Sequence, residues 1–140
     1  MLLIKILTSK FYLIEKSMKM RLNNNFLEDF KKYNFSIIKE KVVFLVGSAR
    51  FREYFIKIES ILQINYKKLV YIASVDGLLN KEKFSEDEWE VLQEIALTKL
   101  KNQEAILVLD VNGYIGDHTR QEIEVFKNKL RRPVYYFSKL

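Results

Sequence analysis

The fold is decided by Ala105-Ile106-Leu107-Val108-Leu109-Asp110, a continuous apolar run that ends on a carboxylate. A polar loop follows, Tyr114-Ile115-Gly116-Asp117-His118, and leads into a helix. Open α/β sheets bind ligands at the carboxyl ends of their strands, where a strand gives way to such a loop and a helix start. Because this loop also carries the chain's only histidine, the sequence predicts a ligand site here.

Three more runs have the composition of strands. They are residues 41–46, 68–73 and 134–137. Continuous apolar runs are typical of strands buried on both faces of a sheet, and helical segments separate these runs from one another. We therefore predict an α/β fold in which the four runs form one parallel sheet, with right-handed crossovers and helices on both faces.

The helices between these runs can be recognised by their periodicity and caps. One apolar face recurs at intervals of three and four residues, in Phe51, Phe55, Ile58 and Leu62. Ser85-Glu86-Asp87-Glu88 matches the capping box that starts a helix. A last helix is predicted from about Thr119 to Leu130, and Thr119-Arg120-Gln121-Glu122 repeats the capping-box pattern at its start.

The composition excludes several function classes. At 140 residues the chain is long enough for one domain with a substantial core. It has no cysteine and one histidine, so disulfides, thiolate zinc sites and a cysteine nucleophile are excluded, and we expect no metal and no cofactor. Lys5 interrupts the early apolar run 1–7, which therefore predicts neither a signal peptide nor a membrane span. The default expectation is a cytoplasmic protein with no membrane partner.

The net charge of +6 is concentrated near the N-terminus. Residues 1–41 hold nine Lys or Arg against four Asp or Glu, which leaves a balance of +1 for the rest. Arg21 is the single arginine among them, so the pattern favours a solvated lysine surface, and we do not expect nucleic acid as a partner. We divide the chain into a basic N-terminal extension, 1–40, packed on an α/β domain, 41–140. Residues 2–7 could add a further strand.

Gly47-Ser48-Ala49-Arg50 is the loop that follows the first predicted strand of the α/β domain. Glycine permits a tight turn there, and free amides at a helix start favour an anion. Ser48 adds a hydroxyl and Arg50 a guanidinium, so phosphate is a plausible ligand. Many Gly-Ser turns bind nothing, and Arg50 is equally consistent with a solvated residue. Its charge opposes the helix dipole, however, which favours a functional role.

The loop around residue 118 offers three carboxylates and the histidine. Glu122 fits a capping box with Thr119, and from the pattern alone that structural role is the better interpretation. Asp117 and Asp110 suit loop roles equally well, and His118 is typical of a solvated loop residue. The nearby helix N-terminus is expected to keep Glu122 ionised.

Three segments carry a family resemblance. They are Phe44-Leu45-Val46-Gly47-Ser48-Ala49-Arg50, Tyr114-Ile115-Gly116-Asp117-His118-Thr119-Arg120-Gln121-Glu122-Ile123, and Arg132-Pro133-Val134-Tyr135. Together they resemble the nucleoside 2-deoxyribosyltransferase family over roughly residues 41–138. The Gly-Ser-x-Arg start is also similar to that of 2'-deoxynucleoside 5'-phosphate N-glycosidases.

The resemblance implies a flavodoxin-like sheet and a reaction at an N-glycosidic bond. It assigns Glu122 as the nucleophile, which attacks the anomeric carbon, and Asp117 as the candidate acid that protonates the departing base. The residues expected to bind the sugar or its 5'-phosphate are Gly47, Ser48, Arg50, Asp110, Tyr114 and Gly116. The implied partner is a small-molecule nucleoside or nucleotide, and a homo-oligomer stays open.

Two function classes remain open at this point. One is an enzyme that cleaves or transfers the N-glycosidic bond, and the paired loops with Glu122 favour it. The other is a non-catalytic nucleotide-binding or sensing module. Ala96 and Phe44 favour the second class, because relatives often carry an Asp or His and an aromatic hydroxyl at those places. The direction of the Glu122 carboxylate, into a cleft beside Ser48 or back onto the Thr119 amide, discriminates between the two.

Overall fold

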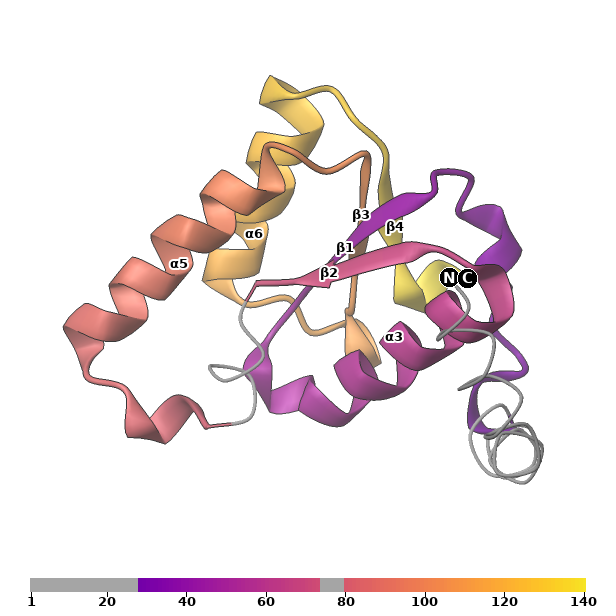
Figure 1. Ribbon diagram of the computed structural model, residues 1–140, viewed down its shortest axis with the longest axis horizontal. Helices are drawn as coiled ribbons and strands as arrows, with labels where there is room; N and C mark the ends of the chain where they lie inside the picture. Colours follow the sequence, from indigo (N-terminus) through magenta and orange to yellow (C-terminus); the bar gives the residue numbers. More distant parts are fainter. Residues whose placement is uncertain (1–27, 74–79) are drawn as a thin grey trace, which may run out of the picture. The chain divides into compact units, whose positions relative to one another are not determined.

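The computed structural model describes residues 28–73 and 80–140 (Figure 1). The chain divides into two units, 1–32 and 33–140, so the predicted boundary between residues 40 and 41 lies within the second unit. In the first unit, Glu28–Phe30 form a short 3-10 helix. The strand predicted at residues 2–7 lies outside the described residues.

The second unit contains the predicted parallel sheet. Its strands are β1 (Val42–Val46), β2 (Leu69–Ile72), β3 (Ala105–Val108) and β4 (Val134–Tyr136). They pair in the order β2-β1-β3-β4, and all three pairings are parallel. This order matches the first four strands of the flavodoxin-like arrangement, so the predicted α/β fold class is confirmed.

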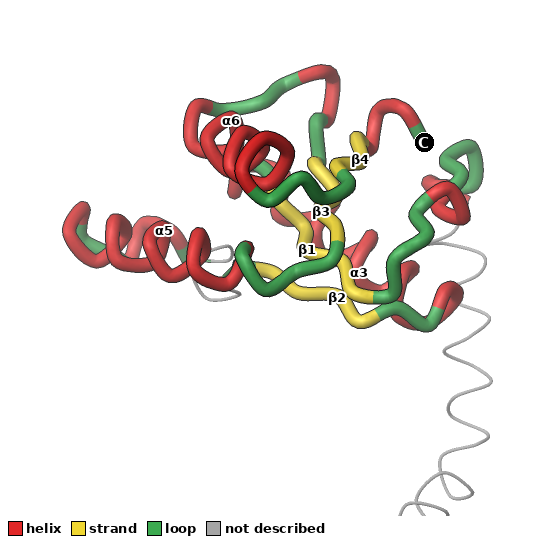
Figure 2. Tube along the Cα trace, turned by 90° about the horizontal axis from the view of Figure 1, so that it is seen from above, coloured by secondary structure: helices red, strands yellow, loops and turns green. Residues whose placement is uncertain are grey.

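Helices cover both faces of the sheet, as predicted. They are α3 (Arg52–Tyr66), α5 (Glu86–Leu100) and α6 (Asp117–Glu124), and α6 continues into a π-helical turn, Val125–Lys129. Figure 2 shows α5 and α6 on one side of the sheet and α3 on the other. The connection from β1 to β2 runs one way across the sheet, and the connections from β2 to β3 and from β3 to β4 run the other way. Because all three crossovers have the same hand, α3 lies on one face and α5 and α6 lie on the other.

The core follows the alternation of side chains along β1 and β3. On the side of α5 and α6, residues of β1 and β3 pack against Leu100 of α5 and Phe126 of the π-helical turn. The strand residues of this cluster are Phe44, Val46, Ile106 and Val108. The residues between them on the strands, such as Leu45 and Leu107, are buried as well. Both faces of these central strands are therefore dry, which explains their continuous apolar sequence.

The two predicted capping boxes have different outcomes. The first is confirmed at the start of α5, where the Ser85 hydroxyl accepts from the Glu88 amide and the Glu88 carboxylate accepts from the Ser85 amide. The second is wrong. α6 begins at Asp117 with Gly116 as its N-cap, and the Arg120 amide already donates to the Gly116 carbonyl at 3.0 Å. Thr119 is therefore inside the first turn, and Glu122 lies a turn further along.

None of the helices in the described part of the chain is both long and apolar enough to cross a membrane.

Candidate functional site

The carboxyl ends of β1 and β3 lie side by side at the point where the chain turns to opposite sides of the sheet. Such a point leaves a crevice between the two outgoing loops. Gly47 directly follows β1 here, and a Cβ atom added to it would lie 3.2 Å from the Leu109 Cβ and 3.3 Å from the Leu109 carbonyl oxygen. Glycine is therefore needed here for a second reason besides the predicted tight turn, because the backbone at Gly47 passes close to Leu109 after β3.

A cavity of about 100 Å³ opens at this edge of the sheet. Its walls come from β1, β2, α3, α5 and α6. Thirteen residues line it: Leu45, Val46, Gly47, Ala49, Phe55, Ile72, Ala73, Trp89, Leu92, Gln93, Ala96, His118 and Glu122. Elements far apart in the sequence thus meet at one small site.

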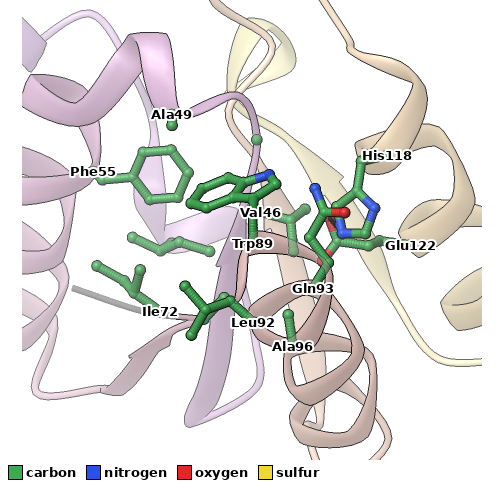
Figure 3. A pocket seen from close by; sticks show the side chains of 13 residues that line it. Val46, Ala49, Phe55, Ile72, Trp89, Leu92, Gln93, Ala96, His118 and Glu122 are labelled. Carbon is green, nitrogen blue, oxygen red and sulfur yellow. Dashed lines mark ion pairs between the residues drawn. The ribbon is translucent and has the colours of Figure 1, made fainter. Parts of the chain in front are cut away.

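The cavity is apolar at one end and polar at the other. Figure 3 shows the ring of Trp89 beside Phe55, with Leu92 along the same wall. At the other end the side chains of Gln93, His118 and Glu122 point toward one another (Figure 3). A flat apolar wall facing a small polar group is the usual make-up of a small-molecule site.

Glu122 is buried at the polar end. Its residue surface is 4% exposed, and its side chain makes no hydrogen bond to the described residues. Its side chain makes no hydrogen bond to the Thr119 amide and lines the cavity, although Ser48 is not among the lining residues. Burial raises the pKa of the Glu122 carboxyl to about 7. Desolvation of the carboxylate therefore opposes the expected effect of the helix N-terminus, and both protonation states of Glu122 are populated near neutral pH.

His118 faces Glu122 from the preceding turn of α6. Its Nε2 atom lies 3.9 Å from Glu122 Oε1, and that nitrogen is buried with no hydrogen-bond partner among the described residues. Burial lowers the pKa of the His118 imidazole. The interpretation of His118 as a solvated loop residue is therefore wrong, since it lies in the first turn of α6 and lines the cavity.

A second, basic pocket of about 450 Å³ adjoins the first, and Ala49 lines both. Its other residues are Ser48, Arg50, Arg52, Lys81 and Glu82. The Ser48 hydroxyl caps the short 3-10 helix Ala49–Phe51 by accepting from the Arg50 amide at 3.3 Å. The Lys81 ammonium lies 5.0 Å from the centre of the Trp89 ring, so the two pockets also meet there.

The other predicted site residues lie outside both pockets. Asp110 is buried and accepts from the Ser138 amide at 2.9 Å and from the Ser138 hydroxyl at 2.6 Å. Tyr114 stacks under Arg50, Gly116 caps α6, and Asp117 is exposed. Of the predicted site residues, Gly47 and Glu122 therefore line the first cavity, and Ser48 and Arg50 line the basic pocket.

Sequence reasoning missed the aromatic and amide groups of α5. Neither Trp89 nor Gln93 was given a role in the site. The overlooked signal is a polar residue one turn after Trp89 on a face that is otherwise apolar. Since α5 extends past the carboxyl ends of the strands, its first half lines the cavity, and only Ala96 and Leu100 are buried among its described side chains.

Within the described residues, no three His, Cys, Asp or Glu side chains gather into a group that could hold a metal ion. Comparisons of the chain with protein-family models, with curated proteins and with solved structures found no match. The resemblance to the nucleoside 2-deoxyribosyltransferase family therefore stays a prediction.

Proposed function

We propose that this protein cleaves or transfers the N-glycosidic bond of a deoxynucleoside or nucleotide, with Glu122 as the nucleophile. One observation carries the proposal: the Glu122 carboxyl is buried at the end of an apolar cavity, away from any cap. Two buried carboxyl groups occur among the described residues, and the contrast between them is informative. Asp110 is satisfied by Ser138, whereas Glu122 is left for a ligand.

The chemistry requires a carboxylate next to an anomeric carbon and a surface that holds the leaving base. Glu122 supplies the first, and the ring of Trp89 on the opposite wall supplies a stacking face for a planar heterocycle. The ionised carboxylate attacks the anomeric carbon as the bond to the base breaks, which gives a covalent glycosyl-enzyme intermediate. Water or a second base then takes the sugar from Glu122.

The basic pocket supports a nucleotide as the substrate. Ser48, Arg50 and Lys81 border it, and it joins the cavity at Ala49 and at the contact between Lys81 and Trp89. A base against Trp89 and a sugar beside Glu122 would leave a 5'-phosphate near these cations. Guanidinium groups bind phosphate with good geometry, which gives Arg50 the predicted role.

The proposal is tested by incubating the protein with a panel of deoxynucleosides and their 5'-monophosphates and measuring the free base released. The matched pair of variants is Glu122→Gln and Glu124→Gln, since Glu124 is an exposed residue on the same helix. Glu122→Gln should lower base release at least about a thousandfold and Glu124→Gln should leave it unchanged. Absence of base release by the wild type across the panel would reject the enzyme.

The raised pKa of Glu122 favours one second candidate, a non-catalytic nucleotide-binding module. A protonated carboxyl donates a hydrogen bond and does not attack carbon, so it could recognise a base without reacting. This candidate predicts binding without base release, and an affinity that survives Glu122→Gln because the amide also donates. Equilibrium dialysis of a deoxynucleoside monophosphate separates the two functions.

A further inference from the structure

We infer that His118 and Glu122 work as a couple that carries one proton, in which His118 protonates the departing base. The inference rests on the proposed function and deepens it, because it names the acid that the reaction needs. It assigns to α6 both the nucleophile and the proton donor, one helical turn apart.

The geometry singles out this pair. Residues four apart on a helix project from the same face, and here the two facing atoms are Nε2 and Oε1 at 3.9 Å. Nε2 has no hydrogen-bond partner among the described residues, so it is available to the carboxyl or to a ligand. Asp117, in contrast, is exposed and lines neither pocket.

No other ionisable group competes for the proton among the described residues that line the cavity. β1, β2 and α3 contribute apolar side chains and Gly47, and α5 contributes Trp89, Leu92, Gln93 and Ala96. The carboxamide of Gln93 points toward the pair but does not titrate (Figure 3). A proton that enters this site therefore resides on His118, on Glu122 or on the ligand.

Near neutral pH the pair includes a form with a protonated Glu122 beside a neutral His118, since burial raises the pKa of the first and lowers that of the second. Transfer of the proton from Oε1 to Nε2 produces a carboxylate and an imidazolium. The carboxylate forms a bond to C1' while the bond from C1' to the base nitrogen breaks and its electron pair stays on the base. The imidazolium proton then goes to the base, which leaves neutral.

The second half of the reaction returns the proton. Neutral His118 takes a proton from water as the water oxygen bonds to C1' and the bond from C1' to Glu122 breaks. This step leaves Glu122 as a carboxylate and His118 as an imidazolium. Return of the proton from Nε2 to Oε1 restores the protonated Glu122 and neutral His118. The cycle consumes one water molecule and needs no other acid.

The inference is tested with two substrates that differ in their need for an acid. A deoxynucleoside leaves as a base that must be protonated, whereas the paranitrophenyl deoxyriboside leaves as a stable phenolate. His118→Asn should slow base release by about 100- to 10,000-fold and change nitrophenol release by less than about tenfold. Glu122→Gln should abolish both. The inference is overturned if His118→Asn slows both substrates equally. It is also overturned if Asp117→Asn, and not His118→Asn, slows base release while sparing nitrophenol release. The proposed function stands in either case.

A second measurement does not require activity. Because the chain has one histidine, a single set of imidazole NMR signals reports the titration of His118. If the two groups share one proton, the imidazole signals of the wild type should include a step near the Glu122 pKa of about 7, and Glu122→Gln should remove that step while Glu124→Gln keeps it. An identical titration in all three proteins shows that the groups are not coupled and overturns the inference. If the wild type releases neither base nor nitrophenol, the proposed function and the catalytic couple both fall, and a coupled titration would then leave a proton-sharing pair without this reaction.

Discussion

The guanidinium of Arg50 lies over the ring of Tyr114, with its Cζ atom 4.0 Å from the ring centre. Phe51 also meets that ring edge-on, with the ring centres 5.9 Å apart. The loop after β1 and the loop after β3 are therefore joined by side-chain stacking at the edge of the sheet. A cation held on an aromatic face keeps its N–H groups directed outward, where an anion can reach them.

We expect Arg50→Ala to weaken the binding of a deoxynucleoside 5'-monophosphate by about ten- to a hundredfold and to leave binding of the unphosphorylated nucleoside nearly unchanged. The reason is the loss of charge-assisted hydrogen bonds from the guanidinium to the phosphate. Isothermal titration of both ligands measures the difference. Arg120→Ala is the matched control, because Arg120 is exposed and lines neither pocket. Equal affinities of wild type and Arg50→Ala for the monophosphate would reject a phosphate site.

The free energy of unfolding should depend on pH through Glu122. Its folded pKa of about 7 lies above the ordinary value of 4.5, so the folded state keeps a proton that the unfolded chain releases. Stability from this group is fully present below pH 4.5 and is lost as the pH rises to about 7, by on the order of 3 kcal/mol.

Glu122→Gln should remove this loss and be more stable than the wild type above pH 7. His118 acts in the opposite sense, since its lowered pKa makes stability fall as the pH decreases, but it is present in both proteins. Urea unfolding of the pair at a series of pH values isolates the contribution of Glu122. If the free energies of unfolding of the wild type and Glu122→Gln differ by the same amount at every pH, the pKa of Glu122 is not raised by folding.

Fluorescence should report occupation of the cavity, because Trp89 is the chain's single tryptophan and forms part of the wall. Stacking of a heterocycle on its ring is expected to quench its emission in a saturable way. Trp89→Leu keeps an apolar wall but loses the aromatic face, and we expect about a tenfold weaker affinity measured by dialysis. Val91→Ala, an exposed position on the same helix, serves as the control. Unchanged emission at saturating nucleotide would place the ligand elsewhere.

Asp110 should prove structural, in contrast to its predicted role in substrate binding. Its two hydrogen bonds to Ser138 join the end of β3 to the 3-10 helix Phe137–Lys139. We expect Asp110→Ala to lower the free energy of unfolding by about 2 kcal/mol. A double-mutant cycle with Ser138→Ala should give less than additive losses, because both changes remove the same hydroxyl bond. Full stability together with a loss of nucleotide affinity would restore the binding role.

The strands were predictable because each carries its own signal. Residues buried on both faces of a sheet form continuous apolar runs, and β1 and β3 have such runs whatever the rest of the chain does. The start of α5 was equally predictable, since Ser85 and Glu88 bond only to each other's backbone and need no tertiary partner. These elements depend on local chemistry, which the sequence contains in full.

The start of α6 and the polar end of the cavity could not be predicted in the same way. Thr119 and Glu122 have capping-box spacing, but the helix begins at Asp117, and the sequence pattern is identical for both starts. His118 is a loop residue under one start and a cavity residue under the other. The choice depends on the packing of α6 against β1 and α5, which is tertiary and brings together residues distant in the chain.

The cavity has a thermodynamic consequence that is independent of the reaction. Its walls come from two parts of the chain, Leu45 to Ala73 and Trp89 to Glu122, so an unfolded or half-folded chain has no cavity to offer. Any ligand that fits will therefore bind the native state alone and raise the melting temperature by mass action. At a hundred times its dissociation constant the gain is about 2.7 kcal/mol. A thermal-shift screen of nucleobases, nucleosides and nucleotides can thus find the ligand before any product is known.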